Sequence, residues 1–246
     1  MQDVLCADEV TSLEMVNKQA IEAQDRAEAR PAHELVYQNL RERILFGEMA
    51  PGQPVTIQGL VASLGAGMTP VREAIRRLTS EGALVFLGNR RIIVPDLTLD
   101  HLEELIFIRK TIECELARRA TGHIGEDDLE RLKRFDMALD EAISAGDVHG
   151  YLVQNYRFHE AIYACADAPI LRETANRLWL RFGPSLRVVC GRFGTQNLPD
   201  RHKDLLEAFK AEDAELAQRA MAQDIVQGMD QIAAYLTENT DSIDMK

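Results

Sequence analysis

The sequence predicts a mainly α-helical protein, in which a small helical module that ends in a β-hairpin precedes a larger all-α bundle. Residues 31–95 contain three short amphipathic segments, followed by two apolar runs around a turn. Residues 98–240 show helical periodicity and no further strand pattern. Only 8 prolines and 15 glycines interrupt the 246 residues, so most of the chain can be helical. A polar extension, residues 1–30, precedes the module.

The first two helices of the module are expected at Glu34–Phe46 and Ile57–Leu64, separated by the turn cluster GEMAPGQPV. Thr56 can cap the second helix and Gly65 can end it. For the third helix we expect Thr69 as the N-cap, Pro70 at the first helical position and an end near Ser80.

Two apolar runs, Ala83–Leu87 and Ile92–Val94, flank the turn Gly88-Asn89 and predict a β-hairpin. Three short helices followed by a hairpin form a winged helix-turn-helix. The bundle is expected to consist of helices over residues 98–121, 126–145, 147–166, 169–191, 199–211 and 213–237.

The charge is divided unevenly along the chain. The net charge is −12, yet residues 31–95 carry 7 basic and 5 acidic groups. Residues 1–30 and 96–246 carry net charges of −4 and −10. A short basic segment attached to an acidic body is typical of a small DNA-binding module joined to another domain.

The composition favours a globular protein with no membrane partner. Apolar residues make up 46% and charged residues 28% of the chain, and runs such as Ile92–Val94 are far too short to span a bilayer. The N-terminal residues lack the basic start and apolar stretch that mark a secretory signal. The cysteines at positions 6, 114, 165 and 190 form no CxxC pair, which fits a reducing compartment. We therefore expect a cytoplasmic protein.

The third helix presents the candidate DNA contacts. Arg72 and Arg76 are four residues apart and share one face, from which both can reach bases or phosphates in a major groove. Thr69 at the helix start can donate to a phosphate, and Arg90 and Arg91 occupy the expected hairpin tip. The opposite face is apolar and can pack into the module: Val71, Ala74, Ile75 and Leu78.

Two other interpretations of this helix remain open. Its basic face can be simply a solvated surface. Arg77 lies four residues after Glu73, so these two side chains can form an intrahelical ion pair instead of contacting DNA.

The stretch TPVREAIRRLTSEGALV resembles the recognition-helix signature of the GntR family of bacterial regulators. LEELIFIRKTIECELARRA resembles the first helix of the FCD effector domain, found in the FadR-type subfamily. The resemblance covers about residues 33–237. It implies a homodimeric, operator-binding transcriptional regulator, by family habit a repressor, that senses a small carboxylate effector and is not an enzyme. The chain departs from the family pattern at Gly67, Met68, Gln58 and Asn89, so two expected DNA contacts are missing.

The resemblance also implies a divalent metal site. Asn155 and His159 are four residues apart, and His202 and Asp224 are 22 apart, which is the family's ligand spacing with two ligand types exchanged. Two imidazoles, a carboxylate and an amide oxygen suit Zn, Ni, Mn or Fe(II). The alternative is a buried polar network without metal.

For the effector pocket, the resemblance implies that Arg109 binds a ligand carboxylate, with Arg187 and Asn176 as further wall residues. Alternatively, Arg109 pairs with Glu113 four residues later. Trp179 is expected in the core. The remaining histidines are expected at the surface: His33, His101, His123 and His149.

Two alternatives for the whole protein remain. The helical domain can serve dimerisation alone, with no metal. Two histidines and a carboxylate with an open position are also a catalytic pattern, which would make the bundle an all-α metalloenzyme.

Overall fold

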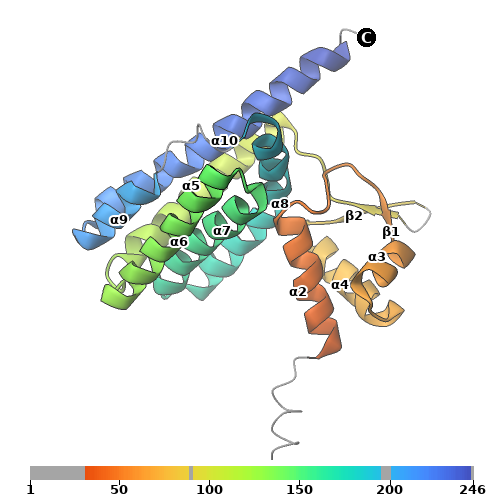
Figure 1. Ribbon diagram of the computed structural model, residues 1–246, viewed down its shortest axis with the longest axis horizontal. Coiled ribbons are helices and arrows are strands. Elements are labelled where there is room, and N and C mark those ends of the chain that lie inside the picture. Colours follow the sequence, from red (N-terminus) through yellow and green to blue (C-terminus); the bar gives the residue numbers. More distant parts are fainter. Residues whose placement is uncertain (1–30, 89–90, 195–200, 245–246) are drawn as a thin grey trace, which may run out of the picture.

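A mixed N-terminal module and a helical C-terminal bundle make up the chain, and helix α2 lies at the joint between them (Figure 1). The computed structural model describes residues 31–88, 91–194 and 201–244; the expected extension, residues 1–30, and Arg90 lie outside them. The module contains α2 (Ala32–Leu45), β1 (Val55–Thr56), α3 (Ile57–Leu64), α4 (Met68–Ser80), β2 (Val85–Leu87) and β3 (Arg91–Ile93). The bundle contains α5 (Leu99–Ala120), α6 (Glu126–Ala145), α7 (Val148–Cys165), α8 (Pro169–Phe193), α9 (His202–Lys210) and α10 (Ala214–Asp244).

The module is a winged helix-turn-helix, as predicted. Thr56 accepts a hydrogen bond from the Gly59 amide at 3.0 Å, and Gly65 ends α3 with a positive φ of 59°. The expected apolar face of α4 is buried: Val71, Ala74, Ile75 and Leu78.

The start predicted for α4 was wrong. The helix begins at Met68 with extended Gly67 as its N-cap, so Thr69 lies in the first turn and does not cap it.

A third strand joins the predicted hairpin. The antiparallel sheet has the order β1-β3-β2, with Val55 opposite Ile92 on one side and Phe86 opposite Ile92 on the other. The sequence did not indicate β1, because a two-residue strand has no alternating pattern and follows a turn-rich stretch. Only its pairing with β3, more than thirty residues later, makes it a strand.

The bundle helices follow the predicted bounds closely, because their caps are local. Thr98 accepts a hydrogen bond from the His101 amide at the start of α5, and Asp147 accepts one from the Gly150 amide at the start of α7. Helix α10 continues to Asp244, seven residues beyond the prediction. The long helices α5 and α10 pack side by side (Figure 1).

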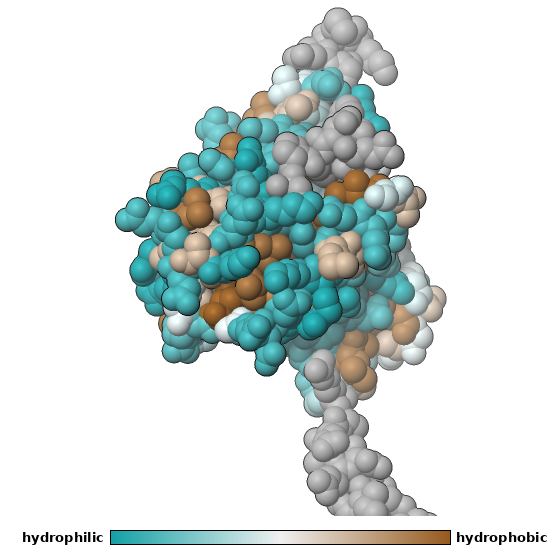
Figure 2. Space-filling model, turned by 60° about the vertical axis from the view of Figure 1, so that its left-hand side comes forward, coloured by the Kyte–Doolittle hydropathy of each residue, from teal (hydrophilic) through white to brown (hydrophobic). Residues whose placement is uncertain are grey.

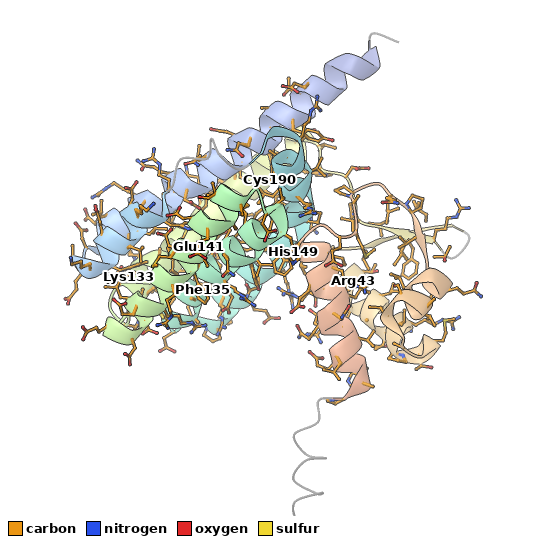
Figure 3. All side chains as sticks on the ribbon, viewed as in Figure 1. Arg43, Lys133, Phe135, Glu141, His149 and Cys190 are labelled. Carbon is orange, nitrogen blue, oxygen red and sulfur yellow. The ribbon has the colours of Figure 1, made fainter. Side chains whose placement is uncertain are left out.

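At the joint between module and bundle, α2 and the turn that follows it pack closely against α8. A Cβ added to Gly183 would lie 2.6 Å from the carbonyl oxygen of Leu45, so only glycine permits this approach. Gly47, with φ of 69°, lies directly against the side chain of Arg187. His149, labelled in Figure 3, lies in the first turn of α7. Its ring packs edge-on against Phe46, with centroids 5.7 Å apart.

The face of the molecule drawn in Figure 2 is largely polar. Hydrophobic areas lie there among predominantly hydrophilic side chains. Across the described residues, no helix is both long and apolar enough to cross a membrane.

Candidate functional site: an exposed basic helix and a buried His/Asp cluster

The candidate DNA contacts lie at the surface of the module. Thr69, Arg72 and Arg76 are exposed on α4, and Arg91 is exposed at the first residue of β3. Arg76 bonds Glu73 at 2.6 Å in an exposed i,i+3 pair. Such a pair contributes little to stability, so Arg76 can exchange it for a phosphate or a base.

The pairing of Arg77 with Glu73, which the sequence left open, is not the one that forms. Arg77 instead bonds Glu34 at 3.0 Å and Glu81 at 3.3 Å, and its guanidinium lies 3.6 Å from the centre of the Tyr37 ring. The Tyr37 hydroxyl donates to Glu81 at 2.9 Å. Arg77 therefore fastens α4 to α2, and its neighbours on the exposed face are the candidates for DNA contact.

The four candidate metal ligands meet between three helices of the bundle. His159 and Asn155 come from α7, His202 is the first residue of α9 and Asp224 comes from α10. His159 Nε2 lies 3.1 Å from Asp224 Oδ2, and His202 Nε2 lies 3.1 Å from Asn155 Oδ1. His202 Nε2 is 4.0 Å from Asp224 Oδ1. Donor atoms of one octahedral ion lie about 3 Å apart along an edge and about 4 Å apart across it, so this donor set fits a single divalent ion.

Hydrogen bonds behind His159 orient its ring. The Tyr163 hydroxyl donates to Glu113 at 2.7 Å and therefore has only acceptor capacity left for His159 Nδ1 at 3.4 Å. His159 thus carries a proton on Nδ1, and its Nε2 faces Asp224, where it can donate a second proton to the carboxylate or, deprotonated, bind a metal. Burial, and then the charge of Glu113, raise the pKa of Tyr163 well above its usual value, which keeps the hydroxyl protonated.

His202 faces a buried carboxylate with the other side of its ring. Its Nδ1 lies 3.5 Å from the buried carboxylate of Asp136 on α6, and its ring stacks on Phe158 with centroids 3.9 Å apart. The 3.5 Å contact with Asp136 lies outside hydrogen-bond geometry, so the stacking on Phe158 holds the ring and the carboxylate acts on it through its charge. Both histidines therefore present Nε2 to the same point.

Asp224 supplies the negative charge of the cluster. Burial raises its pKa, but the charge and hydrogen bond of His159, with smaller contributions from His202 and Arg109, outweigh burial and lower the pKa to about 2. The carboxylate is therefore ionised at neutral pH. An ionised carboxylate beside two imidazoles can be balanced by a metal cation or by a proton on histidine.

Arg109 forms the expected pair with Glu113, and its role in binding a ligand carboxylate stays a prediction. It is buried, and Nε and Nη2 bond Glu113 at 2.6 and 3.0 Å. Burial lowers the pKa of Arg109, but the charge and hydrogen bonds of Glu113, together with smaller contributions from Tyr163 and Asp224, outweigh burial and raise the pKa, so the guanidinium stays charged. The guanidinium also lies 3.9 Å from the ring centre of Phe182 and lines the cavity beside the cluster.

That cavity has a volume of about 50 Å³, which is room for an ion with a few waters or a compact ligand. Apolar side chains form part of its wall, including buried Trp179, which the sequence placed in the core. The cluster residues His159, His202 and Asp224 also line it, together with further polar side chains: Arg109, Asn155, Arg201, Gln227 and Gln231.

Asn176 and Arg187, predicted as further wall residues of the effector pocket, do not line this cavity. The side-chain oxygen of Asn176 accepts a hydrogen bond from the Tyr156 hydroxyl at 3.1 Å, and its backbone carbonyl accepts one from Arg41 of α2 at 3.2 Å. Arg187 packs on Gly47. Both side chains face the joint with α2, because the face of α8 that meets the cavity carries Trp179, Phe182 and Leu186.

Sequence reasoning missed Asp136, Tyr163 and Arg201. The spacing of four residues between His159 and Tyr163 was available as a signal that they share a helical face. Nothing local identifies Asp136, which reaches His202 only through the packing of α6 on α9. The four histidines expected at the surface are all exposed.

A winged helix-turn-helix joined to a helical domain with a buried polar cavity defines a class of protein. These are the transcriptional regulators that carry a DNA-binding module and a sensor domain in one polypeptide. The model of bacterial regulatory proteins of the gntR family matches residues 32–94, and that of the FCD domain matches residues 104–227. The chain belongs to the GntR family, and its bundle is an FCD domain.

Known transcriptional regulators are similar in sequence to most of this chain. It is 30% identical over 191 residues to the HTH-type transcriptional regulator McbR of Escherichia coli K12, covering 76% of this chain and 86% of McbR. It is 25% identical over 216 residues to the transcriptional repressor RspR of the same organism, covering 86% and 93% of the two chains.

Solved structures show the same architecture. The structure of E. coli McbR/YncC superposes with a TM-score of 0.77 at 29% identity and covers 86% of this chain and 99% of that one. A GntR regulator from Rhodococcus sp. RHA1 shares the fold, with a TM-score of 0.68 at 23% identity over 82% of this chain and 97% of that one.

Proposed function

We propose that this regulator is a homodimeric repressor that acts in the cytoplasm and senses a small carboxylate through a divalent metal in its bundle. The observation that carries the proposal is the convergence of His159, His202 and Asp224, whose ligand atoms all lie within 4.8 Å of one another. His159 and His202 both direct Nε2 inward.

In this proposal Asn155, His159, His202 and Asp224 hold the ion. The metal, as Zn, Ni, Mn or Fe(II), supplies Lewis acidity that binds a carboxylate. Arg109 faces the same cavity, and Nη1 is not used in its pair with Glu113, so the guanidinium can bind the same carboxylate. The cavity volume favours a compact acid.

On the module, Thr69, Arg72, Arg76 and Arg91 are proposed to contact operator DNA, and Arg90 of the wing tip stays a prediction. A homodimer would bind two half-sites of a palindrome. For the effector to regulate, it must bind one arrangement of bundle and module more tightly than the other, and DNA must then weaken effector binding by the same factor.

Elemental analysis of the purified protein tests the metal site. The protein is stripped with chelator, reloaded with each of the four metals and dialysed. We expect about one equivalent in the wild type and none in His159→Ala/His202→Ala, with His149→Ala, an exposed histidine, as the matched control.

A metal-free wild type would overturn the metal part of the proposal. The 3.1 Å contacts of His159 with Asp224 and of His202 with Asn155 would then be a metal-free hydrogen-bonded network. Turnover of a candidate acid by the loaded protein would instead favour a metalloenzyme and overturn the sensory role.

A further inference from the structure

The outer face of α5 carries a large apolar side chain that is mostly exposed. Phe107, in the middle of the helix, is 75% exposed, and its neighbours Ile106 and Ile108 are only partly buried. A single exposed hydrophobic residue is ordinary on a protein surface. The surroundings of Phe107 therefore decide whether it belongs to an interface.

Phe107 borders an apolar groove between the bundle and the module. The groove has a volume of about 880 Å³, and its wall includes Val85 and Phe86 of the wing strand β2. Strand β2 lies at an edge of the sheet, and all three of its side chains are exposed. Apolar side chains on the flank of the wing are unsuited to a phosphate backbone, so this flank fits a protein partner.

The charges around Phe107 are arranged symmetrically along α5. Glu104 lies three residues before Phe107 and Lys110 three residues after it. Within the described part of the chain, neither side chain forms an ion pair with its own chain. If two α5 helices crossed antiparallel at Phe107, Glu104 of each copy would face Lys110 of the other. That is the self-complementary pattern that a two-fold interface requires.

We propose that the face of α5 centred on Phe107 is the two-fold interface between two copies of this chain, with the second copy also covering the groove beside β2. This inference rests on the homodimer of the proposed function and assigns its surface. A stable dimer buries about 1,200–2,000 Å² in total, more than one helix face offers, and the groove wall supplies further apolar area.

The position of α5 gives this interface a consequence for DNA binding. Helix α5 begins at Leu99, only a few residues after β3 ends at Ile93. A contact between the two α5 helices therefore also sets the separation of the two modules, which must match the spacing of the operator half-sites.

The test measures the dimer dissociation constant of the full-length chain by sedimentation. Phe107→Glu is expected to weaken dimerisation about 30-fold or more, as for a central apolar anchor. Met137→Glu, at a residue that is 62% exposed on α6 and does not line the groove, is the matched control and is expected to leave the constant unchanged.

A charge exchange tests the same surface if Phe107→Glu fails to fold. Glu104→Lys and Lys110→Glu each place like charges across the two-fold axis and are expected to weaken the dimer. The double variant Glu104→Lys/Lys110→Glu restores opposite charges and is expected to recover it. A wild type that is monomeric at all concentrations would overturn the homodimer itself. A wild-type dimer that tolerates all of these changes would overturn only the assigned surface.

Discussion

The two candidate sites of this regulator differ in how their side chains are held. On α4, Arg72 and Arg76 are exposed, and Arg76 has only a surface partner. In the bundle, His159 and Arg109 are almost fully buried, and each is oriented by a further buried side chain. The difference predicts that changes on α4 alter DNA binding at constant stability, whereas changes in the bundle alter stability and ligand binding together.

The largest expected effect comes from Glu113→Gln. The change leaves the charge of Arg109 buried without its carboxylate, which costs about 3–5 kcal/mol when a buried pair loses one member. Glu115→Gln, two residues along α5, is the matched control, because Glu115 pairs with Arg118 and Arg119 at the surface. Chemical denaturation of both variants measures the two costs. Equal losses for the two variants would contradict the contrast between buried and exposed sites.

Arg72→Ala is expected to weaken specific DNA binding by about 1–3 kcal/mol, the cost of one lost bidentate base contact. The free energy of unfolding should stay within about 0.5 kcal/mol of the wild type, because Arg72 is exposed. Fluorescence anisotropy with operator DNA measures the affinity, and Arg118→Ala on the bundle is the control. Operator affinity equal to that of the wild type would remove Arg72 from the interface.

Tyr163→Phe removes the hydroxyl that bridges His159 and Glu113 while keeping the ring. Loss of an oriented partner behind a metal-bound histidine lowers metal affinity about 10- to 100-fold. Competition with a chelator of known affinity measures this loss. Unchanged affinity would show that the orientation of His159 does not depend on Tyr163.

The smallest effect is pH-dependent. Hydrogen bonds from Arg118 and Arg119 lower the pKa of Glu115 to about 2. A lowered pKa stabilises the folded chain above the ordinary glutamate pKa of about 4.3, and the gain is lost as the pH falls through about 2. The stability difference between wild type and Glu115→Gln, under about 1 kcal/mol for a surface pair, should therefore shrink from pH 5 to pH 2. A difference that grows on acidification would contradict this assignment.

Local patterns accounted for most of the fold and for half of the candidate metal site. Helix caps such as Thr56 and Thr98 act within three residues, so the helix starts that they set were predictable. Asn155 and His159 share a face of α7 because they are four residues apart. The exception was α4, where Gly67 takes the N-cap position expected for Thr69, because the chain can enter the helix without a side-chain cap.

The sequence by itself determined the order of elements, the buried and exposed faces of α4, and the positions of the histidines along their helices, because a period of 3.6 residues is a local property. Only the tertiary structure decided which helix faces meet. It brought Asp224 and Asp136 to the two histidines and turned Asn176 and Arg187 toward α2. It also paired β1 with β3. These outcomes depend on how each helix is rotated against its neighbours, and that rotation is set by packing between residues far apart in the chain.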